Sequence, residues 1–287
     1  MIDLSLNELL LCYKFPYRRQ TVRYDYSIEI FSFHFSFKQT MFMTIENQPI
    51  RYETAGVGRT VVFLHGWGGG IAGFQGCCNI LSEDFRTVNL ELPGFGQSPP
   101  PAYPFDVGDY ARIVIKFIQA VCGGPVSVVG HSFGGRIGLI LAADFSEYVE
   151  KVILIDSAGL KPRRGLRYFW RLRRYKWAKR LVKRKLLDPK RLEKYGSADW
   201  RALSPALRET FKKVVNRRLD VYAARIRIPT LILWGAKDRD TPIYMAKRLH
   251  KRIKNSALHI FPEAGHYSYI DCFRESNGIM RTFLSKN

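Results

Sequence analysis

Short apolar runs alternate with stretches of helical periodicity along most of the chain. The runs are rich in Val, Ile and Leu and end at glycine, proline or charged residues, which predicts strands at 42–46, 50–54, 60–64, 85–90, 125–129, 152–155, 230–234 and 257–261. Apolar residues at helical spacing predict helices at 109–121, 135–144, 244–251 and 275–284. Asn47 and Gln48 separate the first two strands and are expected to form a hairpin turn.

Apolar strands that alternate with helices indicate parallel strands buried on both faces of a sheet. We therefore predict an α/β fold with a mostly parallel, doubly wound sheet, whose core is formed by residues 41–160 and 223–287. Residues 161–222 interrupt the alternation because they are helix-rich and contain no strand-like run. This segment, called the basic cap below, is expected to be a helical insertion between the sixth and seventh strands of the core.

Residues 1–40 form an N-terminal extension that does not fit this alternation. Apolar positions of one parity occupy 22–30, and the parity changes at Phe31. One interpretation is an extra hairpin or edge strand with a bulge at the change. The other, which we favour, is that translation starts at Met41 or Met43, because the run from Met43 already completes the fold.

Charge is concentrated in the basic cap. The chain has 46 Lys and Arg against 25 Asp and Glu, a net charge of +21. Residues 161–218 hold 22 of the basic and four of the acidic side chains, which leaves 24 and 21 for the rest of the chain. A nearly neutral body thus carries one cationic segment.

Aromatic side chains are interleaved with the positive charges between 163 and 185, which leaves three interpretations of the basic cap. It could be a solvated surface whose aromatics pack on the body. It could attract an anionic substrate or anionic lipid, since basic helices with Trp and Phe suit membrane interfaces. Contact with nucleic acid through phosphates is the least favoured, because only charge and no motif supports it.

Cysteine usage and the N-terminus bear on the cellular compartment. The five cysteines form no C-x-x-C pair and their number is odd, which favours reduced thiols over a disulfide framework. No apolar run reaches ~18 residues, and the first residues are acidic where a secretory signal would be basic. We expect a cytoplasmic protein, with peripheral contact to a membrane as the alternative.

A nucleophile motif follows the strand predicted at 125–129. The pattern G-x-S-x-G is met by the run Gly130-His131-Ser132-Phe133-Gly134, which precedes the helix predicted at 135–144. A serine on such a strand-to-helix turn is exposed in a strained backbone geometry, and the flanking glycines let neighbouring chain pass close by. Ser132 is therefore predicted to be a catalytic nucleophile.

Candidates for the base and the acid follow two later strands. His266, in Glu263-Ala264-Gly265-His266-Tyr267, is the one histidine in a loop after a late strand, and it is predicted to be the base. Asp238 follows the strand at 230–234, where a carboxylate can orient an imidazole. Asp240 and Asp156 remain alternatives. His131, beside Ser132, is expected to line the pocket.

With this chain order of serine, aspartate and histidine, residues 43–284 resemble the α/β-hydrolase superfamily. The turn Glu91-Leu92-Pro93-Gly94-Phe95-Gly96-Gln97-Ser98 and the loop His65-Gly66-Trp67-Gly68-Gly69-Gly70 add to the likeness. The resemblance implies acyl transfer to Ser132, with His266 as base and then acid and Asp238 orienting it. It also implies backbone oxyanion donors at Trp67 and Phe133, a supporting role for His65, Gly66, Gly130 and Gly134, and no metal or organic cofactor.

The nucleophile and the loop after His65 differ from those of several hydrolase subfamilies, and these differences limit the reactions that we expect. A serine nucleophile argues against haloalkane dehalogenases and epoxide hydrolases, and the His-Gly-Trp loop is similar to that of small-substrate carboxylesterases. We predict hydrolysis of a carboxylic ester of a small or medium acyl group. The alternatives are carbon–carbon hydrolysis of the meta-cleavage type, whose relatives usually carry a proline in this loop, and acyl hydrolysis at an anionic membrane surface. A non-catalytic binding module is disfavoured because every catalytic position is filled.

Overall fold

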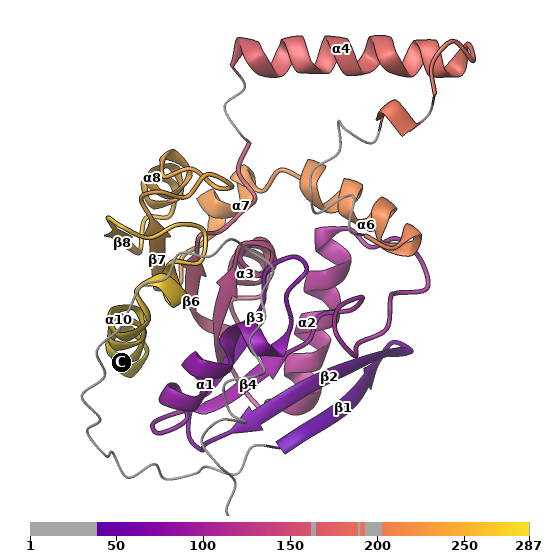
Figure 1. Ribbon diagram of the computed structural model, residues 1–287. Helices are drawn as coiled ribbons and strands as arrows, with labels where there is room; N and C mark the ends of the chain where they lie inside the picture. Colours follow the sequence, from indigo (N-terminus) through magenta and orange to yellow (C-terminus); the bar gives the residue numbers. More distant parts are fainter. Residues whose placement is uncertain (1–38, 162–164, 189, 193–202, 287) are drawn as a thin grey trace, which may run out of the picture. The chain divides into compact units, whose positions relative to one another are not determined.

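The computed structural model describes residues 39–161, 165–188, 190–192 and 203–286 (Figure 1). Residues 1–38 lie outside the described chain, and so does almost all of the extension for which two interpretations were given. None of the helices in the described part is long and apolar enough to cross a bilayer.

One eight-stranded sheet organises residues 39–261. Its order is β1-β2-β4-β3-β5-β6-β7-β8, where the strands are β1 (Gln39–Ile45), β2 (Gln48–Ala55), β3 (Thr60–Leu64), β4 (Arg86–Leu90), β5 (Val126–His131), β6 (Val149–Ile155), β7 (Thr230–Gly235) and β8 (Ser256–Phe261). β2 runs antiparallel to both β1 and β4, and every other neighbouring pair is parallel. The prediction of a mostly parallel sheet is confirmed.

Helices cover both faces of the sheet (Figure 1). They are α1 (Gln75–Leu81), α2 (Val107–Val121), α3 (Phe133–Asp144), α8 (Tyr244–Arg252), α9 (Ser268–Asp271) and α10 (Phe273–Ser285). Along β3, Val62 and Leu64 join the core under α2, α3 and α8, whereas Val61 and Phe63 join the core under α1 and α10. Because alternate residues of a strand point to opposite faces, this fully buried strand reads as a continuous apolar run.

The hairpin between β1 and β2 turns one residue earlier than predicted. Glu46 and Asn47 have φ of 48° and 62°, and Ile45 pairs with Gln48. A two-residue hairpin turn of this kind needs positive φ at both central positions, which Asn tolerates well. Gln48 belongs to the strand because its side chain is buried and its Nε2 donates to the Pro99 carbonyl at 2.8 Å.

The described part of the insertion between β6 and β7 is helical. It contains α4 (Leu166–Lys183), α6 (Pro205–Asn216) and α7 (Asp220–Arg225), and no strand in its described residues. Buried Arg136 of α3 donates to the carbonyls of Val214 and Arg217 at 2.9 and 3.1 Å. This guanidinium therefore binds the C-terminal end of α6, where carbonyls lack partners within the helix.

The cysteines of the described chain are free thiols. Cys77 and Cys78 are buried in α1, and Cys122 and Cys272 are partly buried. Burial raises the pKa of Cys77 to about 12, so its thiolate is scarce at neutral pH.

Candidate active site

Ser132 lies between β5 and α3 in a strained backbone geometry. Its φ of 48° and ψ of −102° are uncommon for any residue other than glycine. Two backbone hydrogen bonds hold the turn, since Ser132 N donates to the Ile155 carbonyl at 3.0 Å and Ala158 N donates to the Ser132 carbonyl at 3.1 Å. The strained serine is thereby fixed against the end of β6.

The two glycines of the G-x-S-x-G run are required by close contacts of the backbone. A Cβ added at Gly134 would lie 1.9 Å from the Leu64 carbonyl oxygen, at the end of β3. A Cβ added at Gly130 would lie 2.5 Å from the Gly134 carbonyl oxygen. Any larger residue at either position would force α3 away from β3 and β5.

Three side chains from different loops form a hydrogen-bonded series. His266 Nε2 lies 3.0 Å from Ser132 Oγ, and His266 Nδ1 lies 2.8 Å from Asp238 Oδ2. An ionised carboxylate accepts from the Nδ1–H, so Nε2 of the neutral ring is left as the acceptor for the serine hydroxyl. The structure brings together the residues that were predicted as nucleophile, base and acid.

Asp238 is oriented by its own loop. Oδ1 accepts hydrogen bonds from the amides of Asp240 and Thr241 at 2.8 and 2.9 Å, and Thr241 Oγ1 lies 2.6 Å from Oδ2. Asp240 is exposed and contributes its amide to this loop. Thr241 was not identified from the sequence, although an aspartate that binds a backbone amide two residues on is a common turn signal.

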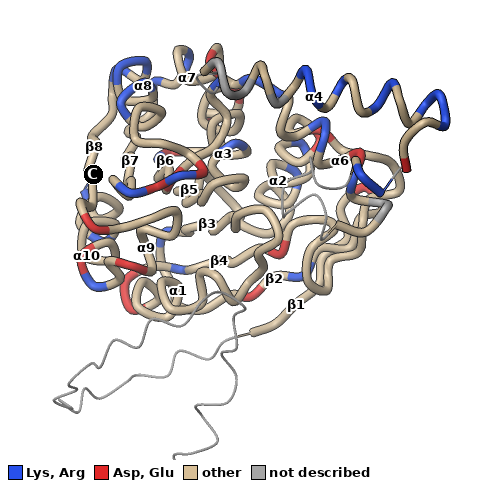
Figure 2. The backbone as a smooth tube through the Cα atoms, turned by 45° about the horizontal axis from the view of Figure 1, so that its top comes forward, with Lys and Arg blue, Asp and Glu red and all other residues tan. Residues whose placement is uncertain are grey.

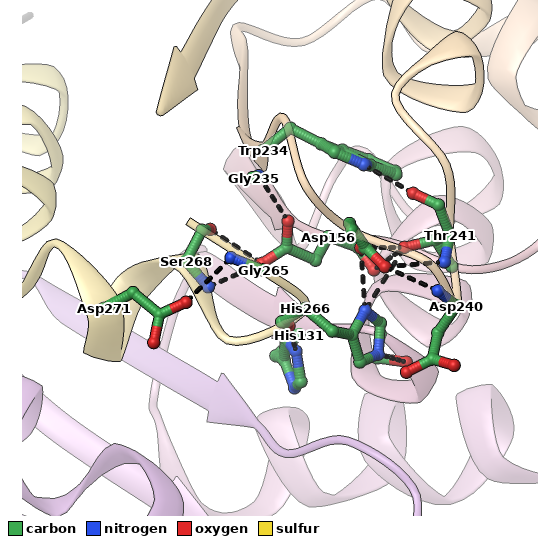
Figure 3. A network of polar contacts seen from close by, with 12 residues as sticks. His131, Asp156, Trp234, Gly235, Asp240, Thr241, Gly265, His266, Ser268 and Asp271 are labelled. Atoms are coloured by element: carbon green, nitrogen blue, oxygen red, sulfur yellow. Dashed lines mark hydrogen bonds and ion pairs between the residues drawn. The ribbon is translucent and has the colours of Figure 1, made fainter. Parts of the chain in front are cut away.

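Asp156, the third candidate acid, occupies a different position. It is completely buried at the end of β6, with φ of 43°. Its Oδ1 accepts from Gly235 N at 2.8 Å, and its Oδ2 accepts from Ser268 N at 3.0 Å and lies 2.7 Å from Ser268 Oγ (Figure 3). Asp156 therefore joins the end of β7 to the start of α9, between the loops that carry Asp238 and His266.

Burial raises the pKa of Asp156 to about 7, in spite of the hydrogen bonds from Ser268 and Gly235, which lower it. The nearby charge of Asp238 raises it further. Asp156 therefore takes up a proton much more readily than an exposed aspartate does.

The pKa values of Asp238 and His266 move apart. Burial raises the pKa of Asp238, but the hydrogen bond and charge of His266 and the hydrogen bonds from Thr241 outweigh it and hold the pKa below its ordinary value. Burial lowers the pKa of His266, but the hydrogen bond to Asp238 and the charge of that carboxylate outweigh it and raise the pKa. The pair therefore favours an ionised carboxylate beside an imidazole that readily accepts a proton.

Two further histidines support the backbone around the site. His65 Nδ1 lies 2.7 Å from the Gly66 carbonyl, and Leu92 N donates to His65 Nε2 at 3.0 Å. His131 Nε2 lies 2.7 Å from the carbonyl of His266. Burial lowers the pKa of His65 to about 4 and that of His131 to about 3, so both rings are neutral.

The expectation that His131 lines the pocket is wrong. Its ring is buried, with only 2% exposure, because it lies under the loop of His266 and binds that loop through the carbonyl. A Cβ added at Gly66 would lie 2.7 Å from His131 Nδ1, so a side chain at Gly66 would displace this support.

The loop after β3 lies beside Ser132. Gly134 N donates to the His65 carbonyl at 3.1 Å, and the rings of Trp67 and Phe133 are 5.1 Å apart. Phe133 is the first residue of α3, so its N–H has no acceptor within the helix. Trp67 and Phe133, the predicted oxyanion donors, are therefore neighbours.

Aromatic side chains line one side of this region. The ring of Trp67 is in edge contact with Phe95, Phe133 and Phe211, at centroid distances of 5.0, 5.1 and 5.1 Å. Phe211 comes from α6, whereas Phe95 comes from the turn after β4, where Gly96 has φ of 55°. The sequence did not identify Phe95 or Phe211, because nothing local indicates that they meet Trp67.

In the described chain, Asp238, Asp240 and His266 form the one group with enough ligand atoms close together to hold a metal ion. Both carboxylate oxygens of Asp238 are already engaged, Oδ1 by two amides and Oδ2 by His266 Nδ1. The donor set therefore fits a hydrogen-bonded triad better than a cation site.

The chain is similar to known hydrolases in sequence and in structure. The model of the alpha/beta hydrolase family matches residues 61–275. An AB hydrolase superfamily protein of Bacillus subtilis, YisY, is 29% identical over 259 residues, which cover 84% of this chain and 97% of the relative. A 2-hydroxy-6-oxo-6-(2'-aminophenyl)hexa-2,4-dienoic acid hydrolase of Metapseudomonas resinovorans is 28% identical over 82% of this chain and 87% of its own. The structure of a membrane phospholipase A, a bacterial virulence factor, superposes with a TM-score of 0.71 at 26% identity, over 86% of each chain.

Proposed function

Because the chain belongs to the alpha/beta hydrolase family, we propose that it hydrolyses a carboxylic ester through an acyl-enzyme intermediate on Ser132. One observation carries the proposal: the chain of contacts from Ser132 Oγ to His266 at 3.0 Å and from His266 to Asp238 at 2.8 Å, on a strained strand-to-helix turn. Such a chain activates a serine whose own hydroxyl is a weak nucleophile.

In the first half of the reaction, Ser132 Oγ attacks the carbonyl carbon of the ester while its proton passes to His266 Nε2. The carbonyl oxygen becomes an oxyanion, which the amides of Trp67 and Phe133 stabilise. Asp238 stays ionised and stabilises the imidazolium. The bond to the leaving alcohol then breaks, and His266 gives its proton to the alcohol oxygen.

In the second half, His266 takes a proton from water, and the oxygen of that water attacks the acyl carbon. The tetrahedral intermediate uses the same two amides. The bond to Ser132 Oγ breaks, His266 returns the proton to this oxygen, and the carboxylic acid leaves. The bonds that form and break involve only the substrate, water, Ser132 and His266.

A fluorophosphonate probe tests the assignment of the nucleophile. We expect it to label the wild type and not Ser132→Ala. Ser127→Ala removes a buried hydroxyl from the same strand without touching the site and is expected to label like the wild type. Labelling of Ser132→Ala would refute the proposal.

The acyl group is proposed to be small or medium in size. The contacts of Trp67 with Phe133 and Phe211 support an apolar binding region beside the oxyanion donors. Turnover of p-nitrophenyl esters graded by chain length and charge tests this. The likeness to a membrane phospholipase A makes long-chain lipid esters part of the same panel.

Carbon–carbon hydrolysis is the second candidate, and the likeness to a dienoic acid hydrolase favours it. Against it, the loop after His65 carries only glycines after Trp67. The two reactions are separated by comparing kcat/KM for p-nitrophenyl esters with that for a dienol-diketone chromophore. A higher value for the diketone would replace the ester proposal and leave the role of Ser132 unchanged.

A further inference from the structure

Two tryptophans of α4 face solvent on one side of the helix. Trp170 is 68% exposed and Trp177 is 65% exposed. They are seven residues apart, which is about two helical turns, so they point to the same side. Isolated exposed apolar residues are ordinary, but two aligned tryptophans in water indicate a surface that binds something apolar.

Among the described side chains of α4, most of the less exposed ones lie away from the tryptophan side, and Leu181 is the exception. Ala178 is buried, and Tyr175 and Val182 are partly buried. At about 100° per residue, these three side chains lie about 90–150° around the helix from the tryptophan pair, on an adjoining side. The aromatics of the basic cap were expected, in one interpretation, to pack on the body; for Trp170 and Trp177 the exposure contradicts this.

Positive charge surrounds the tryptophans. Arg173, Arg174 and Arg180 are exposed and lie three or four residues from one of them. Of the 18 residues of α4, eight are Lys or Arg and none is acidic. Figure 2 shows these basic positions recurring along α4.

Tryptophan prefers the headgroup region of a bilayer, where its ring is apolar and its N–H stays hydrated, and basic side chains bind anionic headgroups. We propose that α4 docks the protein on the surface of a bilayer containing anionic phospholipids. Trp170 and Trp177 enter the headgroup region, and Arg173, Arg174 and Arg180 bind lipid phosphates. Nucleic acid would share the phosphate contacts, but the chain has no nucleic-acid motif and the tryptophan pair suits a planar apolar boundary. This docking goes beyond the proposed hydrolysis and does not depend on it.

Sedimentation of the full chain with vesicles tests the proposal. Vesicles of phosphatidylcholine alone are compared with vesicles of equal parts phosphatidylcholine and phosphatidylglycerol, across a salt series. We expect binding to the anionic vesicles that weakens with salt. The double variant Trp170→Ala/Trp177→Ala and the triple variant Arg173→Gln/Arg174→Gln/Arg180→Gln should each bind at least about tenfold more weakly.

A matched control separates docking from net charge. The triple variant Lys247→Gln/Lys251→Gln/Lys254→Gln removes the same charge from exposed positions on and just after α8 and should bind like the wild type. Turnover of a soluble ester should be unchanged in all three variants, which shows that they fold. Tryptophan emission should shift to the blue with anionic vesicles in the wild type and not in Trp170→Phe/Trp177→Phe.

Three results would overturn the proposal. The first is equal loss of binding in the α4 and α8 charge variants. The second is anionic-vesicle binding that the tryptophan variants leave unchanged. The third is tight binding of duplex or single-stranded DNA without binding of anionic vesicles. Loss of ester turnover in the wild type would instead count against the proposed function and leave the docking result intact.

Discussion

Asp238 and Asp240 are two positions apart in the chain but lie in different surroundings. The side chain of Asp238 is fully buried and contacts His266 Nδ1, whereas Asp240 is exposed. Burial makes the hydrogen bond of a charged group more valuable, because water no longer competes for it. The two carboxylates therefore form a natural matched pair for substitution.

Asp238→Asn is expected to lower kcat by about 10⁴-fold, because an amide stabilises the wrong tautomer of the base and cannot stabilise the imidazolium. Asp240→Asn should stay within about threefold of the wild type, since an exposed charge contributes little. Steady-state kinetics on one p-nitrophenyl ester checks both variants. Equal losses would show that Asp238 does not act alone as the acid.

The raised pKa of His266 predicts a direction for the pH profile. The base works only when it is neutral, so kcat/KM should increase with pH and reach half of its plateau above the ordinary histidine value of 6.5. The charge of Asp238 contributes to this elevation, so Asp238→Asn should move the midpoint of its residual activity to lower pH. A wild-type midpoint below the ordinary value would contradict the assignment.

At the level of elements, α3 can lie close to β3 only because the residue at their contact is a glycine. When the first turn of a helix positions a reacting group, even a small displacement of the helix lowers the reaction rate. Gly134 lies at this contact, whereas Gly278 of α10 is exposed and an added Cβ there would have nothing within 4 Å. The same substitution thus has opposite consequences in two helices.

Gly134→Ala is expected to lower the free energy of unfolding by at least about 3 kcal/mol and to abolish activity, because the new methyl group overlaps the Leu64 carbonyl. Gly278→Ala should raise the free energy of unfolding by about 0.5–1 kcal/mol, because alanine restricts the unfolded chain and favours the helix. Urea unfolding of both variants measures these changes. Destabilisation by Gly278→Ala would contradict this view of α10.

Local sequence patterns did not predict every helix boundary or every short helix. The helix predicted to begin at 109 begins at Val107, because the carboxylate of Asp106 accepts hydrogen bonds from the amides of Gly108 and Asp109. The short helices α1 and α9 were not predicted. Both lie in glycine-containing or loop-like sequence, and α9 starts where buried Asp156 binds Ser268.

At the scale of the whole molecule, the hydrolase body and the charge belong to different parts of the chain. The triad residues lie in loops of the sheet, whereas most of the net charge lies in residues 161–218. In our proposals, the reaction belongs to the first part and docking to the second. The two can therefore be altered independently.

A truncated chain of residues 39–287 tests the two interpretations of the N-terminal extension. It keeps residues 39–42, which pair with β2 at the edge of the sheet. If the upstream residues are not part of the folded protein, the free energy of unfolding should stay within about 1 kcal/mol of the full chain. A larger loss, with a lower Tm, would support the extra hairpin. Mass spectrometry of the natively expressed protein identifies the start directly.

The sequence by itself determined the fold class, the positions of the eight strands to within a few residues, and the candidates Ser132 and His266. Each of these features depends on residues that are close together in sequence, namely apolar runs, flanking glycines and loops that follow strands. A single stretch of chain is therefore enough to predict them.

Only the tertiary structure decided which aspartate contacts His266, that His131 is buried beneath its loop, and that Trp170 and Trp177 face solvent. Asp156, Asp238 and Asp240 all follow parallel strands of one sheet, and their surroundings become different only when distant loops meet. The hydrogen bonds between Asp156 and Ser268 and between His131 and His266 each join residues more than a hundred positions apart. No local pattern specifies such contacts, because the partner of each group is set by how the strands are ordered.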